Sequence, residues 1–128
     1  MNEIGTFDIL GPNMIGPSSS HTAGAARIAL LARKLLTGSL KKVEFTLYGS
    51  FAKTYHGHGT DRALVGGILG YHPDDERIRD SFEHAKEAGL DFTFEENFTD
   101  KEIYPNTVDI YVKDENGNEM SLRGKSIG

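Results

Sequence analysis

Two short segments of the chain hold side chains that could do chemistry. The first reads MIGPSSSHTAGAARIALLARKLL, from Met14 to Leu36, and places three serines, a histidine and a threonine before an alanine-rich run. The first turn of a helix exposes backbone N–H groups without intrahelical partners, and the helix dipole adds about half a positive charge there, so carboxylates bind readily. The segment therefore predicts either a very polar helix cap or a site for a small anion.

The hydroxyl groups of this segment fit both interpretations. In the simpler one, a single serine caps the helix and the others are hydrated; in the other, several hydroxyls surround a bound anion. A Ser-His nucleophile pair is less favourable, because neighbouring side chains at a helix start point in different directions and no third orienting group is identifiable. The hydroxyl groups in question belong to Ser18, Ser19, Ser20 and Thr22.

The second segment is YHGHGTD, from Tyr55 to Asp61, in which His56 and His58 flank a glycine. An imidazole on such an open loop titrates near neutral pH and can approach a substrate closely, as a general base must. His-x-His could also bind a metal, but no further histidine or carboxylate at ligand spacing completes a set. Surface histidines without a role are the third interpretation, and the residues alone leave all three open.

Composition narrows the classes of function. The 128 residues are 38% apolar, which predicts one globular domain over residues 1–128. The formal net charge of -5 argues against nucleic acid or an anionic membrane as the main partner. The sequence shows neither a bilayer-spanning apolar run nor a secretory pattern, so we expect a cytoplasmic protein. With no cysteine, the chain alone cannot hold a thiolate-ligated zinc ion or iron–sulfur cluster.

The elements that must position these segments follow a mixed order. Helical spacing and stop signals predict helices over 22–36, from Thr60 onward, and over 73–89. Alternating apolar residues predict strands over 42–48, 90–96, 107–114 and 119–124, and the Asn116-Gly117 pair predicts a tight hairpin between the last two. We therefore expect an α+β fold with helices packed on one face of a mostly antiparallel sheet.

Both chemical segments together resemble one known family. MIGPSSSHTAGAAR, followed about thirty residues later by LYGSFAKTYHGHGTD, is similar to the β chain, or β domain, of the bacterial iron–sulfur L-serine dehydratases. The stretch from Gly16 to Thr22 matches that family's Gly-Pro-Ser-Ser-Ser-His-Thr signature. The resemblance continues through YPNT to the terminal SIG, so it covers nearly the whole chain.

This resemblance implies a lyase, an L-serine ammonia-lyase of amino-acid catabolism and gluconeogenesis that converts L-serine to pyruvate and ammonia without pyridoxal. In the family, a 4Fe-4S cluster with one iron open to substrate acts on the leaving hydroxyl, while a base removes the α proton. The cluster cysteines belong to an α chain, which fits the absence of cysteine here. The domain by itself is expected to be inactive.

The resemblance also assigns roles to individual residues. His58 falls on the α-proton base, while His21 and the serines fall on the signature near the substrate, where they would hold its carboxylate. Thr60 and Asp61 would shape the loop of His58. Many relatives have proline at the position of Ala25, and relatives often carry histidine where this chain has Tyr104, a phenol that is a poor base at neutral pH.

A rival from another class has the same expected fold. This fold resembles the allosteric substrate-binding domain of some bacterial D-3-phosphoglycerate dehydrogenases. Under that hypothesis the chain is a regulatory module, in which the serine cluster and Arg27 would grip a carboxylate or phosphate and His58 would be incidental. The His-Gly-His segment favours catalysis. Two-chain family members usually continue after Ser-Ile-Gly into a regulatory ACT domain, so we expect residues 1–128 to be part of a longer β chain. The sequence leaves open the oligomeric state and whether threonine is a substrate.

Overall fold

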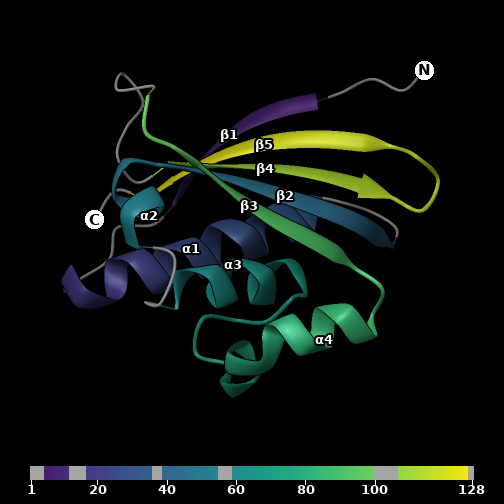
Figure 1. Ribbon diagram of the computed structural model, residues 1–128, viewed down its shortest axis with the longest axis horizontal. Helices are drawn as coiled ribbons and strands as arrows, with labels where there is room; N and C mark the ends of the chain where they lie inside the picture. The colour runs from purple at the N-terminus through teal and green to yellow at the C-terminus, as the bar shows by residue number, and fades with distance from the viewer. Residues whose placement is uncertain (1–4, 12–16, 36–38, 55–58, 100–106, 127–128) are drawn as a thin grey trace.

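The computed structural model describes residues 5–11, 17–35, 39–54, 59–99 and 107–126, in which a layer of helices covers one face of a five-stranded sheet (Figure 1). In chain order the elements are β1 (Gly5–Gly11), α1 (Pro17–Leu35), β2 (Leu40–Tyr48), α2 (Gly49–Thr54), α3 (Thr60–Ile68), the 3-10 helix η1 (Glu76–Asp80), α4 (Ser81–Glu87), β3 (Asp91–Asn97), β4 (Thr107–Asp114) and β5 (Glu119–Ser126).

The strand order of the sheet is β1-β5-β4-β2-β3. The central strand β4 pairs antiparallel with both β5 and β2, whereas β1 joins β5 and β3 joins β2 in parallel at the two edges. The predicted α+β class with helices on one face is confirmed, and the sheet is mixed because its edge strands run parallel to their neighbours.

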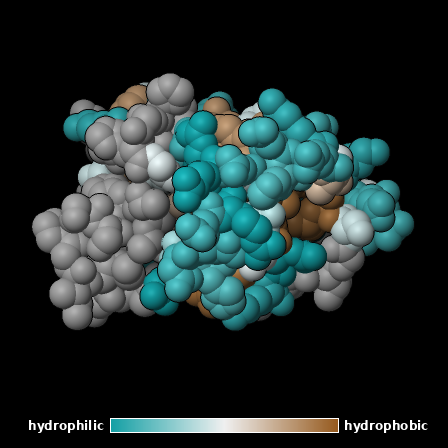
Figure 2. Space-filling view, turned by 90° about the horizontal axis from the view of Figure 1, so that it is seen from below, coloured by the Kyte–Doolittle hydropathy of each residue, from teal (hydrophilic) through white to brown (hydrophobic). Residues whose placement is uncertain are grey.

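Alternation along the strands divides the sheet into a core face and an open face. Val43, Phe45 and Leu47 of β2 are fully buried beneath the helices. The residues between them are only half-buried and lie on the opposite, open face. From below, the outer side of the helical layer is largely hydrophilic, with small hydrophobic patches (Figure 2). Among the described residues, no helix is long and apolar enough to cross a membrane.

Close packing of α1 against α3 depends on Gly67. A Cβ atom at this position would lie 2.6 Å from the carbonyl oxygen of Ala26, 2.6 Å from Cβ of Ala29 and 2.9 Å from the backbone nitrogen of Leu30. Toward the C-terminal ends of both helices, Arg33 of α1 and Ile68 of α3 line the same hollow. The two helices therefore run in the same direction and begin at the same end of the molecule (Figure 1).

Two predicted helices differ from the observed ones. α1 begins at Pro17 rather than at Thr22, because proline fits the first position of a helix, where its missing N–H costs nothing. The helix predicted over 73–89 is divided: the Asp75 side chain caps η1, and a new helix begins at the buried Ser81, whose hydroxyl donates to the Arg62 carbonyl oxygen at 2.9 Å.

The predicted hairpin connects β4 and β5 where the sequence placed it. Asp114 stabilises the turn by accepting hydrogen bonds from the backbone N–H groups of Asn116 and Asn118, each at 2.9 Å. Gly117 has a φ of 86°, while no non-glycine residue of the described chain has a positive φ. Only one residue of the Asn-Gly pair thus adopts the left-handed conformation.

Candidate active site

The first turn of α1 contains the serine cluster. Because the helix begins at Pro17, which has no N–H, the amides without an intrahelical partner belong to Ser18 and Ser19. An anion at the start of α1 would therefore meet the amides of Ser18 and Ser19. Ser20 and His21, which were expected to precede the helix, lie within it, as Thr22 does.

Helical periodicity separates Ser20 from the other residues of the cluster. Ser18, Ser19, His21 and Thr22 each come seven residues, or about two turns, before a fully buried position, namely 25, 26, 28 or 29. Position 20 comes seven residues before the exposed Arg27. Of the five positions from 18 to 22, only position 20 repeats at an exposed residue of the helix.

The start of α3 adds a buried hydroxyl at the same end of the molecule. Gly59, with a φ of 86°, precedes the helix, and Thr60 is fully buried in its first position. Among the described residues, Thr60 Oγ1 is the one buried side-chain oxygen or nitrogen without a hydrogen-bond partner. Since a buried polar group without a partner costs free energy, this oxygen is available to a further group.

Asp61 brings a negative charge into the first turn of α3. The residue is 4% exposed, and its Oδ1 accepts a hydrogen bond from the backbone N–H of Arg62 at 2.7 Å. The guanidinium of Arg62 lies 3.9 Å from the same oxygen. A carboxylate here stabilises the helix start, and it would attract an ammonium or imidazolium group but repel a substrate carboxylate.

The predicted site residues divide into those the structure brings together and those it does not describe. The first turns of α1 and α3 lie at one end of the molecule, where β2 and β5 end and β4 begins (Figure 1). Thr107, which follows Tyr104-Pro105-Asn106 in the sequence, is fully buried at the start of β4. His56, His58 and Tyr104 lie outside the described residues, although Gly59 directly follows His58 in the chain.

The described residues do not offer a ligand set for a metal. In that part of the chain no three histidine, aspartate or glutamate side chains are grouped closely enough to hold an ion. The full sequence contains no cysteine. Without cysteine thiolates, the chain alone does not fit an iron–sulfur cluster.

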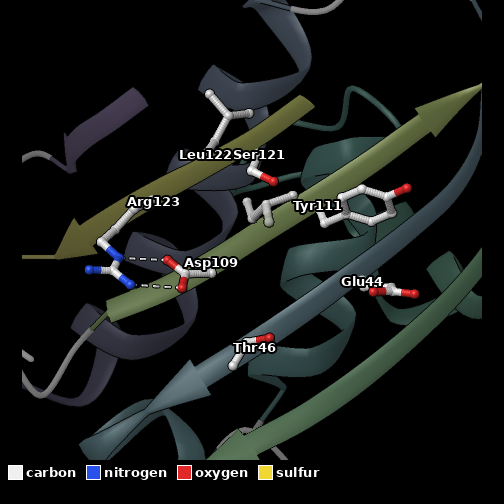
Figure 3. A pocket seen from close by; sticks show the side chains of 8 residues that line it. Glu44, Thr46, Asp109, Tyr111, Ser121, Leu122 and Arg123 are labelled. Carbon is white, nitrogen blue, oxygen red and sulfur yellow. Dashed lines mark hydrogen bonds and ion pairs between the residues drawn. The ribbon is translucent and has the colours of Figure 1, made fainter. Parts of the chain in front are cut away.

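The open face of the sheet contains a polar cluster that the sequence did not reveal. Asp109 of β4 and Arg123 of β5 form two parallel hydrogen bonds, of 2.7 and 2.9 Å, beside a shallow hollow of about 310 Å³ (Figure 3). Strand alternation could have placed both residues on the polar face. Their pairing could not be predicted, because it depends on the register between β4 and β5.

The matching family and two similar relatives of this chain agree with each other. Residues 6–128 match the family described as serine dehydratase beta chain. The chain is 52% identical over 128 residues to the L-serine dehydratase beta chain of Peptoniphilus asaccharolyticus, covering 100% of this chain and 58% of that protein. It is 49% identical over 122 residues to the probable L-serine dehydratase beta chain of Bacillus subtilis, covering 95% of this chain and 54% of that one. The chain thus spans somewhat more than half the length of these relatives.

Proposed function

The chain belongs to the serine dehydratase beta chain family, and on this premise we propose that it is the β part of an L-serine dehydratase. In this proposal it acts with an α chain to convert L-serine to pyruvate and ammonia. The observation that carries the proposal is the arrangement of α1 and α3. One helix begins within Gly-Pro-Ser-Ser-Ser-His-Thr and the other begins directly after His-Gly-His-Gly, and both start at the same end of the molecule (Figure 1).

The start of α1 would bind the substrate carboxylate. The amides of Ser18 and Ser19, which have no partner within α1, and the positive end of the helix dipole favour a negative group at this point. Hydroxyl groups of the serine cluster and of Thr22 would add donors. His21, which shares a helix face with Ser18, would lie beside the bound amino acid and complete this group of donors.

His58 would remove the α proton of serine, and the β-hydroxyl would leave as the Cα–Cβ double bond forms. A carboxylate held by α1 fixes the orientation of the α carbon, so that a base on the segment before α3 can reach its hydrogen. The buried Thr60 Oγ1 could hydrogen-bond to a group of this site. The negative charge of Asp61 would stabilise the imidazolium that forms, or bind the substrate ammonium.

We assign the family's 4Fe-4S cluster to cysteines of the partner α chain, because this chain has none. Bound there, the cluster would supply a Lewis acid for the leaving hydroxyl. We also place the reaction in the cytoplasm, where free serine is metabolised.

The regulatory alternative does not gain support from the geometry. Arg27 lies eight residues beyond Ser19, or about 12 Å along the helix axis, and its side chain is exposed. A small anion held by the first turn of α1 is too far from Arg27 for both to grip it. We therefore keep the catalytic proposal as the one the structure favours.

Reconstitution tests this proposal. The chain would be co-expressed with a cluster-bearing α chain, co-purified through a tag on this chain, and assayed for iron content and for pyruvate formed from L-serine. The proposal predicts a stable complex that contains iron and forms pyruvate, while this chain alone does neither. A cluster-bearing α chain that turns over serine at the full rate without this chain would contradict it.

A further inference from the structure

Three side chains from three neighbouring strands meet on the open face of the sheet. The Tyr48 hydroxyl, at the end of β2, donates to Asp109 Oδ2 on β4 at 2.6 Å. Arg123 of β5 lies directly opposite Asp109 in the register and donates to both of its carboxylate oxygens (Figure 3). The Arg123 guanidinium also lies 5.5 Å from the centre of the Tyr48 ring. We call these residues the Tyr48 network.

The Tyr48 network is more than an exposed surface ion pair. Asp109 and Arg123 are each 31% exposed, whereas Tyr48 is only 6% exposed. Two parallel bonds between a guanidinium and a carboxylate fix the geometry of both groups, and hydrogen bonds to a charged acceptor are stronger than neutral ones. Burial, together with the hydrogen bond to Asp109, raises the pKa of Tyr48 to about 12, so the phenol remains a donor at neutral pH.

The position of Tyr48 connects this network to the candidate site. Tyr48 is the last residue of β2, and Gly49, with a φ of 53°, turns the chain directly into α2. Phe51 of α2 is fully buried in the core. The short helix is therefore held at two points, by Phe51 within it and by Tyr48 just before it.

The segment that contains both histidines comes between two anchored elements. α2 ends at Thr54 and α3 begins at the buried Thr60, so His56 and His58 belong to the short connection between them. On the neighbouring strand, Asp109 comes two residues after the fully buried Thr107. The Tyr48 network thus ties the start of β4 and the end of β5 to the element that leads into His-Gly-His.

We propose that Tyr48, Asp109 and Arg123 are positioning residues that fix α2 on the sheet and, through α2, set the place of the His-Gly-His segment. The effect on α2 follows from the structure of this chain, whereas the effect on catalysis rests on the proposed function. If α2 shifts, the base is displaced from the α proton while the carboxylate site on α1 is unchanged. Turnover should then fall more than substrate binding does.

A matched control lies on the same face of the sheet. The hydroxyl of Tyr111 donates to the carboxylate of Glu119, and this hydrogen bond also raises the Tyr111 pKa to about 12. Tyr111 is on β4, and Glu119 begins β5 next to the hairpin, away from α2. Tyr111→Phe therefore removes the same kind of hydrogen bond without touching the connection to α2.

The first experiment needs only this chain. Amide hydrogen exchange of residues 49–54 would be measured for the wild type, Tyr48→Phe and Tyr111→Phe. Because a net hydrogen bond to a charged acceptor is lost, the amides of α2 should exchange about tenfold faster in Tyr48→Phe and at nearly the wild-type rate in Tyr111→Phe. Equal rates in α2 for the two variants would overturn the proposal.

The second experiment uses the complex with the α chain. Tyr48→Phe and Asp109→Asn should each lower kcat about tenfold or more with little change in KM, while Tyr111→Phe keeps the wild-type kcat. Unchanged kcat in Tyr48→Phe would overturn the role in positioning the base, even if α2 exchanges faster. A wild-type complex that contains iron but forms no pyruvate would refute the proposed function instead, and hydrogen exchange would still decide the effect on α2.

Discussion

Replacing Gly67 by alanine tests the helix packing that brings the two chemical segments together. The new methyl group would lie 2.6 Å from the Ala26 carbonyl oxygen and 2.6 Å from Ala29 Cβ, whereas ordinary contacts begin near 3.4 Å. The helices would have to separate by about 0.8 Å, because a helix backbone cannot yield locally. Overpacking of this kind costs about 3 kcal/mol at the upper end of its range, and the better helix propensity of alanine returns about 1 kcal/mol. We expect a net loss of about 2 kcal/mol.

Gly66 provides the matched control for this prediction. It is the preceding residue of α3, and a Cβ atom there would lie 2.9 Å from Cγ1 of Ile78, a half-buried side chain that can rotate away. Gly66→Ala makes the same chemical change with the same gain in helix propensity, so its stability should stay within about 1 kcal/mol of the wild type.

Urea unfolding followed by circular dichroism measures both variants. Gly67→Ala should shift the midpoint to lower urea with an unchanged m value, and Gly66→Ala should not. If Gly67→Ala unfolds at or above the wild-type midpoint, α1 and α3 do not approach each other at this residue. This contact would then not hold α1 and α3 together.

Three further predictions follow from burial and charge. Phe51→Ala removes a fully buried ring that anchors α2 and should lower the free energy of unfolding by about 3–5 kcal/mol, measured by urea denaturation; a loss below about 1 kcal/mol would contradict the anchoring. The hydrogen bond from Arg77 lowers the Asp75 pKa from 3.8 to about 2, so its contribution to stability is present above pH 3.8 and is lost as the pH falls toward 2; a carboxyl NMR titration near 3.8 would refute this. The raised pKa of Tyr48 contributes stability below pH 10 that is lost as the pH rises toward 12, and Tyr48→Phe should remove one phenol titration near 12 from the ultraviolet spectrum.

Local sequence patterns predicted most of the central sheet. β4 has the bounds expected from its alternation, Thr107–Asp114, and the Asn-Gly turn directed the chain back into β5. β1 was not predicted, because its parallel pairing with β5 depends on residues more than a hundred positions away. The six residues of α2 are too few to show helical periodicity, and Gly49 and Ser50 indicated only the end of a strand.

The candidate site was predictable in its residue types but not in its geometry. The serine cluster and the His-Gly-His segment are visible in the sequence, whereas the packing of α1 against α3 at Gly67 and the common direction of the two helices are properties of the fold (Figure 1). The Tyr48 network could not be predicted, since it requires the register of three strands that are distant in the chain. Whether His58 acts as the base stays a prediction.

Turnover of L-serine by the complex with the α chain tests that prediction most directly, with His58→Gln compared against His56→Gln. Removing a general base should lower kcat by about 10²- to 10⁴-fold, while iron content and co-purification stay at wild-type levels. His56→Gln should keep most of the wild-type rate. A His58→Gln complex that forms pyruvate at a near-normal rate would contradict the central claim that this chain supplies the base.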